Sequence, residues 1–298
     1  MWITNGRWQL MKRLKTLGRK TPGEAALHIF VSAFFAVVAF TYVYLFFWAV
    51  MSACKTHTEI VMDPFGLPKK WNWDHFIEVI TTLEVNGNGF LDMLFNSCFF
   101  SVVGAFLSTF VTITFAYCCT VYKFPGSDWP YTIILIIMTL PIYGAGGATY
   151  ALYRNLGLVD TYAHIICSAA GMSVNFLYFR AYFKNMSWTY AEAAEIDGCG
   201  PFRIYFRVML PQAKPIFGAL FLTTWLGSWN NYESAMLYLP NLPTLPVGIY
   251  QFNTEMIYRA RLDILFAACV LVSIPAIILF TVFNKMITTN VSVGGIKG

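Results

Sequence analysis

Charge is scarce in this sequence of 298 residues: only 12% of the residues are charged, whereas 57% are hydrophobic. A soluble globular domain contains about 25% charged residues, so this chain has too little charge to cover a water-facing surface. The composition therefore excludes an ordinary soluble domain and predicts a membrane protein with several spans.

Several patterns that carry chemistry are also missing. The histidines and cysteines are dispersed and contain no C-x-x-C pair, which predicts neither a metal site nor a disulfide framework and disfavours a membrane-embedded enzyme. Without a G-x-x-x-x-G-K-[ST] motif, we expect this chain to hold no nucleotide phosphate and no cofactor. No internal repeat is visible, although such repeats are usual in secondary transporters.

What the sequence does contain is a series of apolar stretches, each long enough to cross a bilayer, which takes about 20 residues. They are residues 25–53, 94–122, 129–152, 162–183, 215–239 and 263–285. Because hydrocarbon offers no partner to an unpaired backbone group, these stretches should be helices. The sequence thus predicts an all-α membrane protein of six transmembrane helices, with a transmembrane domain over 25–286 between an N-terminal segment 1–24 and a C-terminal tail 287–298.

Lysine and arginine set the orientation of such a protein, because they concentrate in cytoplasmic loops. If the N-terminus is cytoplasmic, 14 of the 20 lie on the cytoplasmic side, and half of the 20 lie in segment 1–24 and between the fourth and fifth apolar stretches. We therefore predict that both termini and the loop 187–214 are cytoplasmic. The formal net charge of +5 then follows from topology and requires no nucleic-acid partner.

The loop 187–214 has the start and stop signals of two short helices. Thr189 and Glu192 fit a capping box that would begin the first helix. Ala193 and Ala194 favour a helix and leave a smooth surface. Gly198 follows Asp197 where that helix should end, because glycine readily takes the left-handed conformation.

The second helix of this loop should begin at Pro201, since proline suits the first position of a helix. Four-residue spacing predicts that apolar Phe202, Phe206 and Met209 share one side, with Arg203 and Arg207 on another. A smooth helix beside a basic one favours docking of another protein onto the loop. The alternative is an ordinary solvated loop between two spans.

At these residues the sequence EAAEIDGCGPFRIYFRVMLP resembles a known family. It is similar to the EAA signature of inner-membrane permease subunits in binding-protein-dependent ABC importers. The matching positions are Glu192, Ala193, Ala194, Gly198, Val208, Leu210 and Pro211. The signature usually has isoleucine at the position of Val208. The C-terminal VGGIKG also resembles the tail of the smaller permease of maltose-type carbohydrate importers.

The resemblance implies a type I importer permease fold in a bacterial inner membrane, with coupling helices between the fourth and fifth spans. It implies a second permease subunit, two ATPase subunits that bind ATP and magnesium, and an extracytoplasmic substrate-binding protein as partners. The cargo it implies is a carbohydrate, in particular an oligosaccharide. The residues implied in coupling to the ATPase are Glu192, Ala193, Ala194, Asp197, Gly198, Arg203, Arg207, Leu210 and Pro211.

A second group of candidates concerns the substrate pathway. Intramembrane charge is costly and usually functional, which singles out Glu233 in the fifth stretch. Amide and aromatic groups around it suit a sugar, and Tyr143 belongs to a glycine-rich stretch that could unwind. The candidates are Trp229, Asn230, Asn231, Glu233 and Tyr143. Packing between helices is the alternative for each of them.

Other cargoes and mechanisms stay open at this stage: an ABC permease for a polyamine, phosphate or peptide, and a secondary transporter driven by an ion gradient. Two further expectations concern lipid. Trp71 and Trp73 should lie at a membrane–water interface. Arg180 and Lys184 should extend toward cytoplasmic headgroups.

Overall fold

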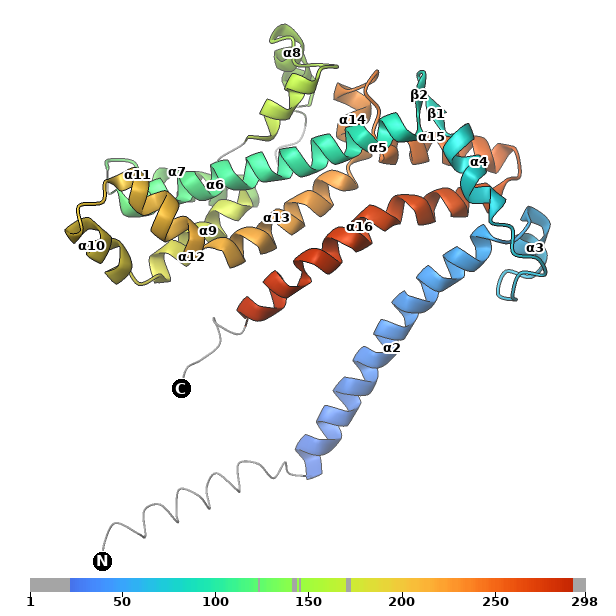
Figure 1. Ribbon diagram of the computed structural model, residues 1–298, viewed down its shortest axis with the longest axis horizontal. Coiled ribbons are helices and arrows are strands. Elements are labelled where there is room, and N and C mark those ends of the chain that lie inside the picture. The colour runs from blue at the N-terminus through green and yellow to red at the C-terminus, as the bar shows by residue number, and fades with distance from the viewer. Residues whose placement is uncertain (1–21, 123, 141–143, 145, 170–172, 292–298) are drawn as a thin grey trace, which may run out of the picture.

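The computed structural model describes residues 22–122, 124–140, 144, 146–169 and 173–291, and this part of the chain is almost entirely helical (Figure 1). Its helices and strands are α2 (Pro22–Ala53), α3 (His57–Met62), α4 (Asp74–Thr82), β1 (Glu84–Val85), β2 (Asn88–Gly89), α5 (Phe90–Cys98), η1 (Phe99–Val103), α6 (Gly104–Val121), α7 (Trp129–Thr139), α8 (Gly146–Asn155), η2 (Tyr162–Ser168), α9 (Val174–Asn185), α10 (Thr189–Ile196), α11 (Pro201–Ile204), η3 (Tyr205–Met209), α12 (Leu210–Gln212), α13 (Lys214–Trp229), α14 (Tyr232–Tyr238), α15 (Leu245–Tyr258) and α16 (Leu262–Val291). Of these, η1 and η3 are π-helical and η2 is a 3₁₀-helix.

The long helices form an elongated bundle with two distinct ends. Helix α6 packs against α9 and α13, and α13 packs against α16. Figure 1 shows α10 and α11 at one end of this bundle and α3, α4 and α15 at the other; we call these the α10 end and the α3 end. Helix α2 meets α16 near the α3 end and then diverges from the bundle.

Within the described residues, three helices are long and apolar enough to cross a membrane. They are Ala26–Ala53, Phe90–Val121 and Leu262–Phe283. These correspond to the first, second and sixth stretches of the sequence prediction. The second of them joins α5, η1 and α6 into one continuous rod.

The other three predicted stretches are divided, a break that the sequence had suggested only for the glycine-rich part of the third. Helix α7 ends at Thr139, because the residue before a proline, here Leu140, is biased away from helical geometry. The fourth stretch consists of the 3₁₀-helix η2 followed by α9, and Ser173 before α9 has extended backbone geometry. The fifth stretch breaks after Trp229, and Asn231 caps a new helix, α14.

The π-helix η1 lies within the second crossing. Its Ser101 is buried, and the Trp225 indole Nε1 of α13 donates a hydrogen bond to the Ser101 Oγ over 3.0 Å. On one side of η1, Phe99 packs against Tyr162 with ring centroids 5.3 Å apart. On the other side, Phe106 packs against Phe217 of α13 at 6.0 Å.

Two apolar clusters stabilise the bundle. The α3-end cluster joins α5, α13, α15 and α16 and includes fully buried Trp225 and Met93. Gly248 lets α15 approach α5 closely, because a Cβ at Gly248 would lie 2.8 Å from the Met93 sulfur. The α10-end cluster joins α6 and α9 to residues 204–213 and includes Phe176, Phe183 and Met209.

A polar network ties the start of α16 to α4. Arg261 donates from both Nη atoms to the Glu78 carboxylate, over 3.0 and 2.9 Å, and from Nε to Asp263 over 3.2 Å. The hydrogen bonds to Glu78 raise the pKa of the Arg261 guanidinium. His75 lies between the Ala53 carbonyl, 2.8 Å from Nδ1, and Asp263, 3.4 Å from Nε2.

Arg180 does not extend toward headgroups, so that expectation was wrong. Its side chain is buried on α9, forms an ion pair with Asp128 and lies over the Tyr131 ring, 4.7 Å from its centroid. Among the described residues, its Nε and Nη1 atoms have no hydrogen-bond partner. Arg180 therefore holds the start of α7 against α9.

Candidate functional site

Helix α10 begins one residue earlier than the sequence predicts, and its predicted cap is absent. The N-cap position is Trp188, which makes no side-chain capping bond, and Thr189 is already the first helical residue. The Thr189 hydroxyl instead lies 3.0 Å from the Ser187 hydroxyl. The prediction of a capping box between Thr189 and Glu192 was wrong, and α10 owes its position to packing by Trp188 on the α10-end cluster.

The turn after α10 has the predicted chemistry. Asp197 is the C-cap, and Gly198 has a φ of +76°, a left-handed conformation that favours glycine. The amide of Cys199 then donates to the Ala194 carbonyl over 2.9 Å, which satisfies a carbonyl at the helix end. Pro201 begins α11, also as predicted.

The two alanines of the EAA sequence have different environments. Ala193 is exposed, whereas Ala194 is half-buried against the α10-end cluster. The expectation that both alanines form an open, smooth surface was therefore wrong for Ala194. Glu192 and Asp197 are exposed, so both carboxylates are free to meet a partner.

Large apolar side chains surround this turn, and sequence reasoning missed two of them. Ile196 is 86% exposed, Phe202 83% and Tyr190 62%. Such exposure on a segment outside the apolar stretches is typical of a protein-binding surface. The sequence could have indicated Ile196 and Tyr190, because large apolar side chains in a polar loop are unfavourable there unless another molecule covers them.

The segment after α11 differs from the predicted regular helix because η3 is a π-turn. Met209 is fully buried, whereas Phe202 and Phe206 are exposed, so the expected shared side was wrong. A π-turn contains an extra residue, which shifts the spacing of the side chains. Tyr205 is buried and lies 2.7 Å from the Thr114 hydroxyl of α6; burial raises the pKa of the Tyr205 phenol.

The remaining loop candidates have two different roles. Arg203 and Arg207 are exposed, and neither has an ion-pair partner among the residues that the structure describes. Leu210 and Pro211 are half-buried, and Leu210 packs on the α10-end cluster. The arginines can thus contact a partner, while Leu210 anchors the loop.

A cavity of about 450 Å³ lies between α10 and the adjacent end of α6. Aromatic and acidic side chains line it, among them Tyr117, Tyr122, Trp188, Glu192 and Glu195. Carboxylates beside aromatic rings favour a cation. This cavity can therefore receive a basic side chain from a protein docked on α10.

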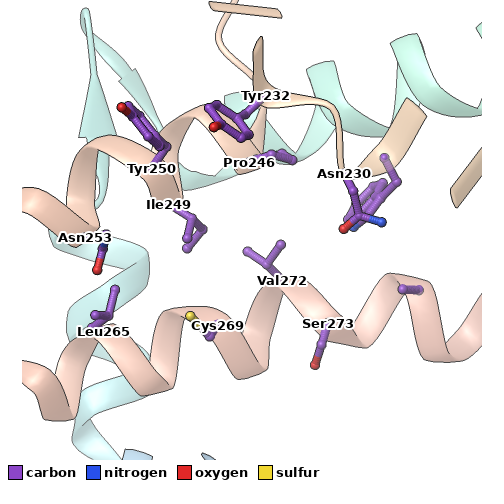
Figure 2. Close-up of a pocket in the computed structure, with 12 residues that line it drawn as sticks. Asn230, Tyr232, Pro246, Ile249, Tyr250, Asn253, Leu265, Cys269, Val272 and Ser273 are labelled. Carbon is purple, nitrogen blue, oxygen red and sulfur yellow. The ribbon is translucent and has the colours of Figure 1, made fainter. Parts of the chain in front are cut away.

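A second cavity, of about 500 Å³, lies at the α3 end between α13, α15 and α16. Figure 2 shows Asn230 at one side of it, Tyr232, Tyr250 and Asn253 along another, and Cys269 and Ser273 on the facing α16. The Tyr232 and Tyr250 rings are stacked with centroids 4.7 Å apart. Amide groups beside aromatic rings can hydrogen-bond a hydroxylated ligand and cover its apolar face.

The structure brings only two of the predicted pathway residues to this cavity. Trp229 and Asn230 line it. The Asn231 side chain instead accepts a hydrogen bond from the Ser234 amide over 2.9 Å as the cap of α14. Glu233 is exposed in the first turn of that helix, and Tyr143 lies outside the described residues.

Sequence reasoning missed the contribution of α15 to this cavity. Pro246, Ile249, Tyr250 and Asn253 line it, at the three- and four-residue spacing that defines one helix face. That periodicity was readable in the sequence.

As for metal binding, no group of three or more His, Cys, Asp or Glu side chains in the described part of the chain could hold an ion.

Comparison with known proteins decides the family. The family described as "Binding-protein-dependent transport system inner membrane component" matches residues 79–293, which include α10, the turn at Gly198 and both cavities. The chain belongs to this family. It is an ABC importer permease subunit, and the resemblance inferred from the EAA sequence is confirmed.

Relatives of this permease align over most of its length. It is 28% identical to the arabinooligosaccharides transport system permease protein AraQ of Bacillus subtilis, over 94% of this chain and 99% of that protein. It is 30% identical to the diacetylchitobiose uptake system permease protein NgcG of Streptomyces coelicolor, over 83% and 82%. A crystal structure of a bacterial ABC transporter involved in the import of the acidic polysaccharide alginate has the same fold, with a TM-score of 0.73 and 22% identity over 90% of this chain and 98% of that one.

Proposed function

We propose that this permease is one transmembrane subunit of an ABC importer for a carbohydrate, in particular an oligosaccharide. The relatives named for arabinooligosaccharide and diacetylchitobiose transport support this cargo class. The observation that carries the coupling role is the exposed turn from Glu192 to Phe202, bound firmly to the ends of α6 and α9. A second permease, two ATPase subunits and an extracytoplasmic binding protein complete the assembly.

The proposed topology has six crossings in a bacterial inner membrane, with both termini cytoplasmic. The three long helices supply the first, second and sixth crossings. The divided segments α7–α8, η2–α9 and α13–α14 supply the others, since a broken span is tolerated where it is buried in protein or lines a cavity. The α10 end is then cytoplasmic and the α3 end extracytoplasmic.

In the proposed mechanism, α10 and the turn at Gly198 dock on a separate ATPase subunit, which binds ATP and magnesium. Glu192 and Asp197 pair with its cations, and Ile196 and Phe202 fill apolar hollows on it. Because Met209 and Tyr205 fix the loop to α6, movement of the loop is passed to the spans. This permease supplies no catalytic group, and ATP hydrolysis belongs to the other chain.

Replacing Glu192 with lysine should uncouple the transporter. Loss of one partner in a buried charge pair costs about 2–5 kcal/mol, so we expect carbohydrate import and binding-protein-stimulated ATP hydrolysis to fall by about tenfold or more. Both are measured on the complete transporter in vesicles. Glu84→Lys, the same change on an exposed residue of β1, is the control, and normal import by Glu192→Lys would contradict the docking role.

For the substrate pathway we propose that cargo passes the cavity between α13, α15 and α16, where Trp229 and Asn230 meet Tyr250. Asn231 and Glu233 do not line the cavity, so any contact that they make with the cargo would be at its outer edge. The aromatic and amide lining favours a sugar over the alternative cargoes, phosphate or a polyamine, which would require buried charge of the opposite sign.

Tyr250→Ala tests this path. An aromatic contact contributes about 0.5–1.5 kcal/mol beyond its buried area, so the substrate concentration at half-maximal import should rise by up to about tenfold. Tyr258→Ala is a matched control, because Tyr258 is on the same helix α15 but is 87% exposed and does not line the cavity. Equal effects of the two substitutions would count against a substrate contact at Tyr250.

A further inference from the structure

The segment between α2 and β1 exposes an unusual amount of apolar surface at the α3 end. Six of its large apolar side chains leave between 46% and 80% of their surface uncovered: Met62, Phe65, Leu67, Trp71, Trp73 and Ile77. The Trp71 and Trp73 rings are stacked with centroids 6.0 Å apart and nearly parallel. A patch of this kind marks an interaction site, and neither the coupling role nor the proposed sugar path uses it.

The same segment folds back along the outer end of α2. The Trp48 indole Nε1 donates to the Pro64 carbonyl over 2.7 Å. Lys55, whose side chain is buried, donates from Nζ to the Asp63 and Pro64 carbonyls over 2.8 and 3.2 Å. These bonds bring the chain back toward the bilayer after it has left α2.

The position of Trp48 fixes the depth of this loop. Trp48 precedes the end of α2 at Ala53 by five residues, or about 7.5 Å along the helix axis. It also lies inside the stretch Ala26–Ala53, which is apolar enough to cross a membrane. The loop that carries Phe65 and Leu67 therefore lies beside the last turns of this apolar stretch.

The charges of the segment complement a phosphate-rich surface. Lys69 and Lys70 are exposed directly before Trp71 and have no ion-pair partner among the described residues. Of the nearby acids, Glu59 is in the capping box of α3, Asp63 accepts from the Gly66 amide over 2.9 Å, and Glu78 pairs with Arg261. Asp74 is exposed in the first turn of α4. The positive charges of Lys69 and Lys70 therefore remain available for the headgroup phosphate.

We propose that residues 61–80 form an interfacial platform that lies in the outer headgroup layer, with a phospholipid surface as its partner. Phe65, Leu67 and Ile77 meet the upper acyl chains, and Trp71 and Trp73 lie at the headgroup level that tryptophan favours. Lys69 and Lys70 bind lipid phosphate. Continuity with the lipid-facing surface of α2 favours lipid over the binding protein or the second permease as the occupant.

Photocrosslinking of the complete transporter tests the proposal. A benzophenone amino acid is placed at Leu67, at Ile77, or at Glu84 as the matched control, because Glu84 is exposed on a hairpin that points away from α3 (Figure 1). The transporter is then reconstituted in vesicles of phosphatidylethanolamine and tritiated phosphatidylglycerol. We expect the permease to carry labelled lipid when the probe is at Leu67 or Ile77, and no labelled lipid when the probe is at Glu84.

Two further variants separate the parts of the platform. Lys69→Glu combined with Lys70→Glu should lower the labelling from Leu67 by tritiated phosphatidylglycerol in the same vesicles, and an unchanged label would contradict the phosphate contact of the two lysines. Lys55→Met should release the loop and lower the lipid crosslink from Leu67, while Ile77, held by α4, keeps its own. Crosslinks from Leu67 and Ile77 to another protein, or to no molecule at all in an assembled transporter, would overturn the proposal.

Discussion

Replacing Gly198 with valine is expected to lower carbohydrate import by about tenfold or more while leaving the permease in the membrane. Gly198 has a φ of +76°, and a left-handed conformation costs an ordinary L-residue roughly 1–2 kcal/mol, more for a β-branched one. The space around a Cβ at this position is open, so the penalty comes from the backbone alone. The turn would relax away from the geometry that presents Glu192 and Phe202 together.

Gly200→Val is the matched control for this prediction. A Cβ at Gly200 also meets no atom within 4 Å, but its φ of −72° and ψ of 162° are an extended backbone conformation that valine adopts without strain. We therefore expect Gly200→Val to import carbohydrate far better than Gly198→Val in the same vesicle assay. Equal losses would show that bulk on the docking surface matters and that the turn conformation does not.

The second large effect is expected at the start of α7, where Asp128→Asn should destabilise the permease by roughly 2 kcal/mol or more. Removing one partner of a buried ion pair costs about 3–5 kcal/mol, and the figure is lower here because Asp128 is 79% exposed. Among the described residues, Arg180 would keep its buried charge with only a neutral amide and the Tyr131 ring as partners. Thermal unfolding of the detergent-solubilised permease measures the loss.

A double variant provides the control. Asp128→Asn combined with Arg180→Met removes the buried charge together with its acid, and such replacements are often nearly neutral. The double variant should therefore be more stable than Asp128→Asn alone. If the double variant were less stable than Asp128→Asn, the lost stability would come from the packing of α7 on α9 and not from an unpaired cation.

The parts of the fold that sequence reasoning predicted correctly are those fixed by local chemistry. Gly198 and Pro201 each restrict the backbone by their own covalent structure, so the break between α10 and α11 could be read directly. The long apolar stretches of α2, of the second crossing and of α16 were equally readable. Each of these features depends on neighbouring residues alone.

The features that escaped prediction depend on segments far apart in the chain. Thr189 matches a capping box by spacing, but packing of Trp188 beneath α10 sets a different start for the helix. Arg180 was expected at the membrane surface because its partner, Asp128, is separated from it by 52 positions. The cavity at Asn230 needs faces of three helices, and no single stretch of sequence contains that geometry.

The extra residue in the π-turn Phe99–Val103 determines how the whole α10 end is oriented. An α-helix advances about 100° per residue, so a regular α-helix through the same residues would rotate α6 by about that amount relative to α5. Phe106 would then leave Phe217, and the hydroxyl of Thr114 would turn away from Tyr205. The extra residue of this π-turn thus sets which faces of α6 meet Phe217 of α13 and Tyr205 of the loop after α11.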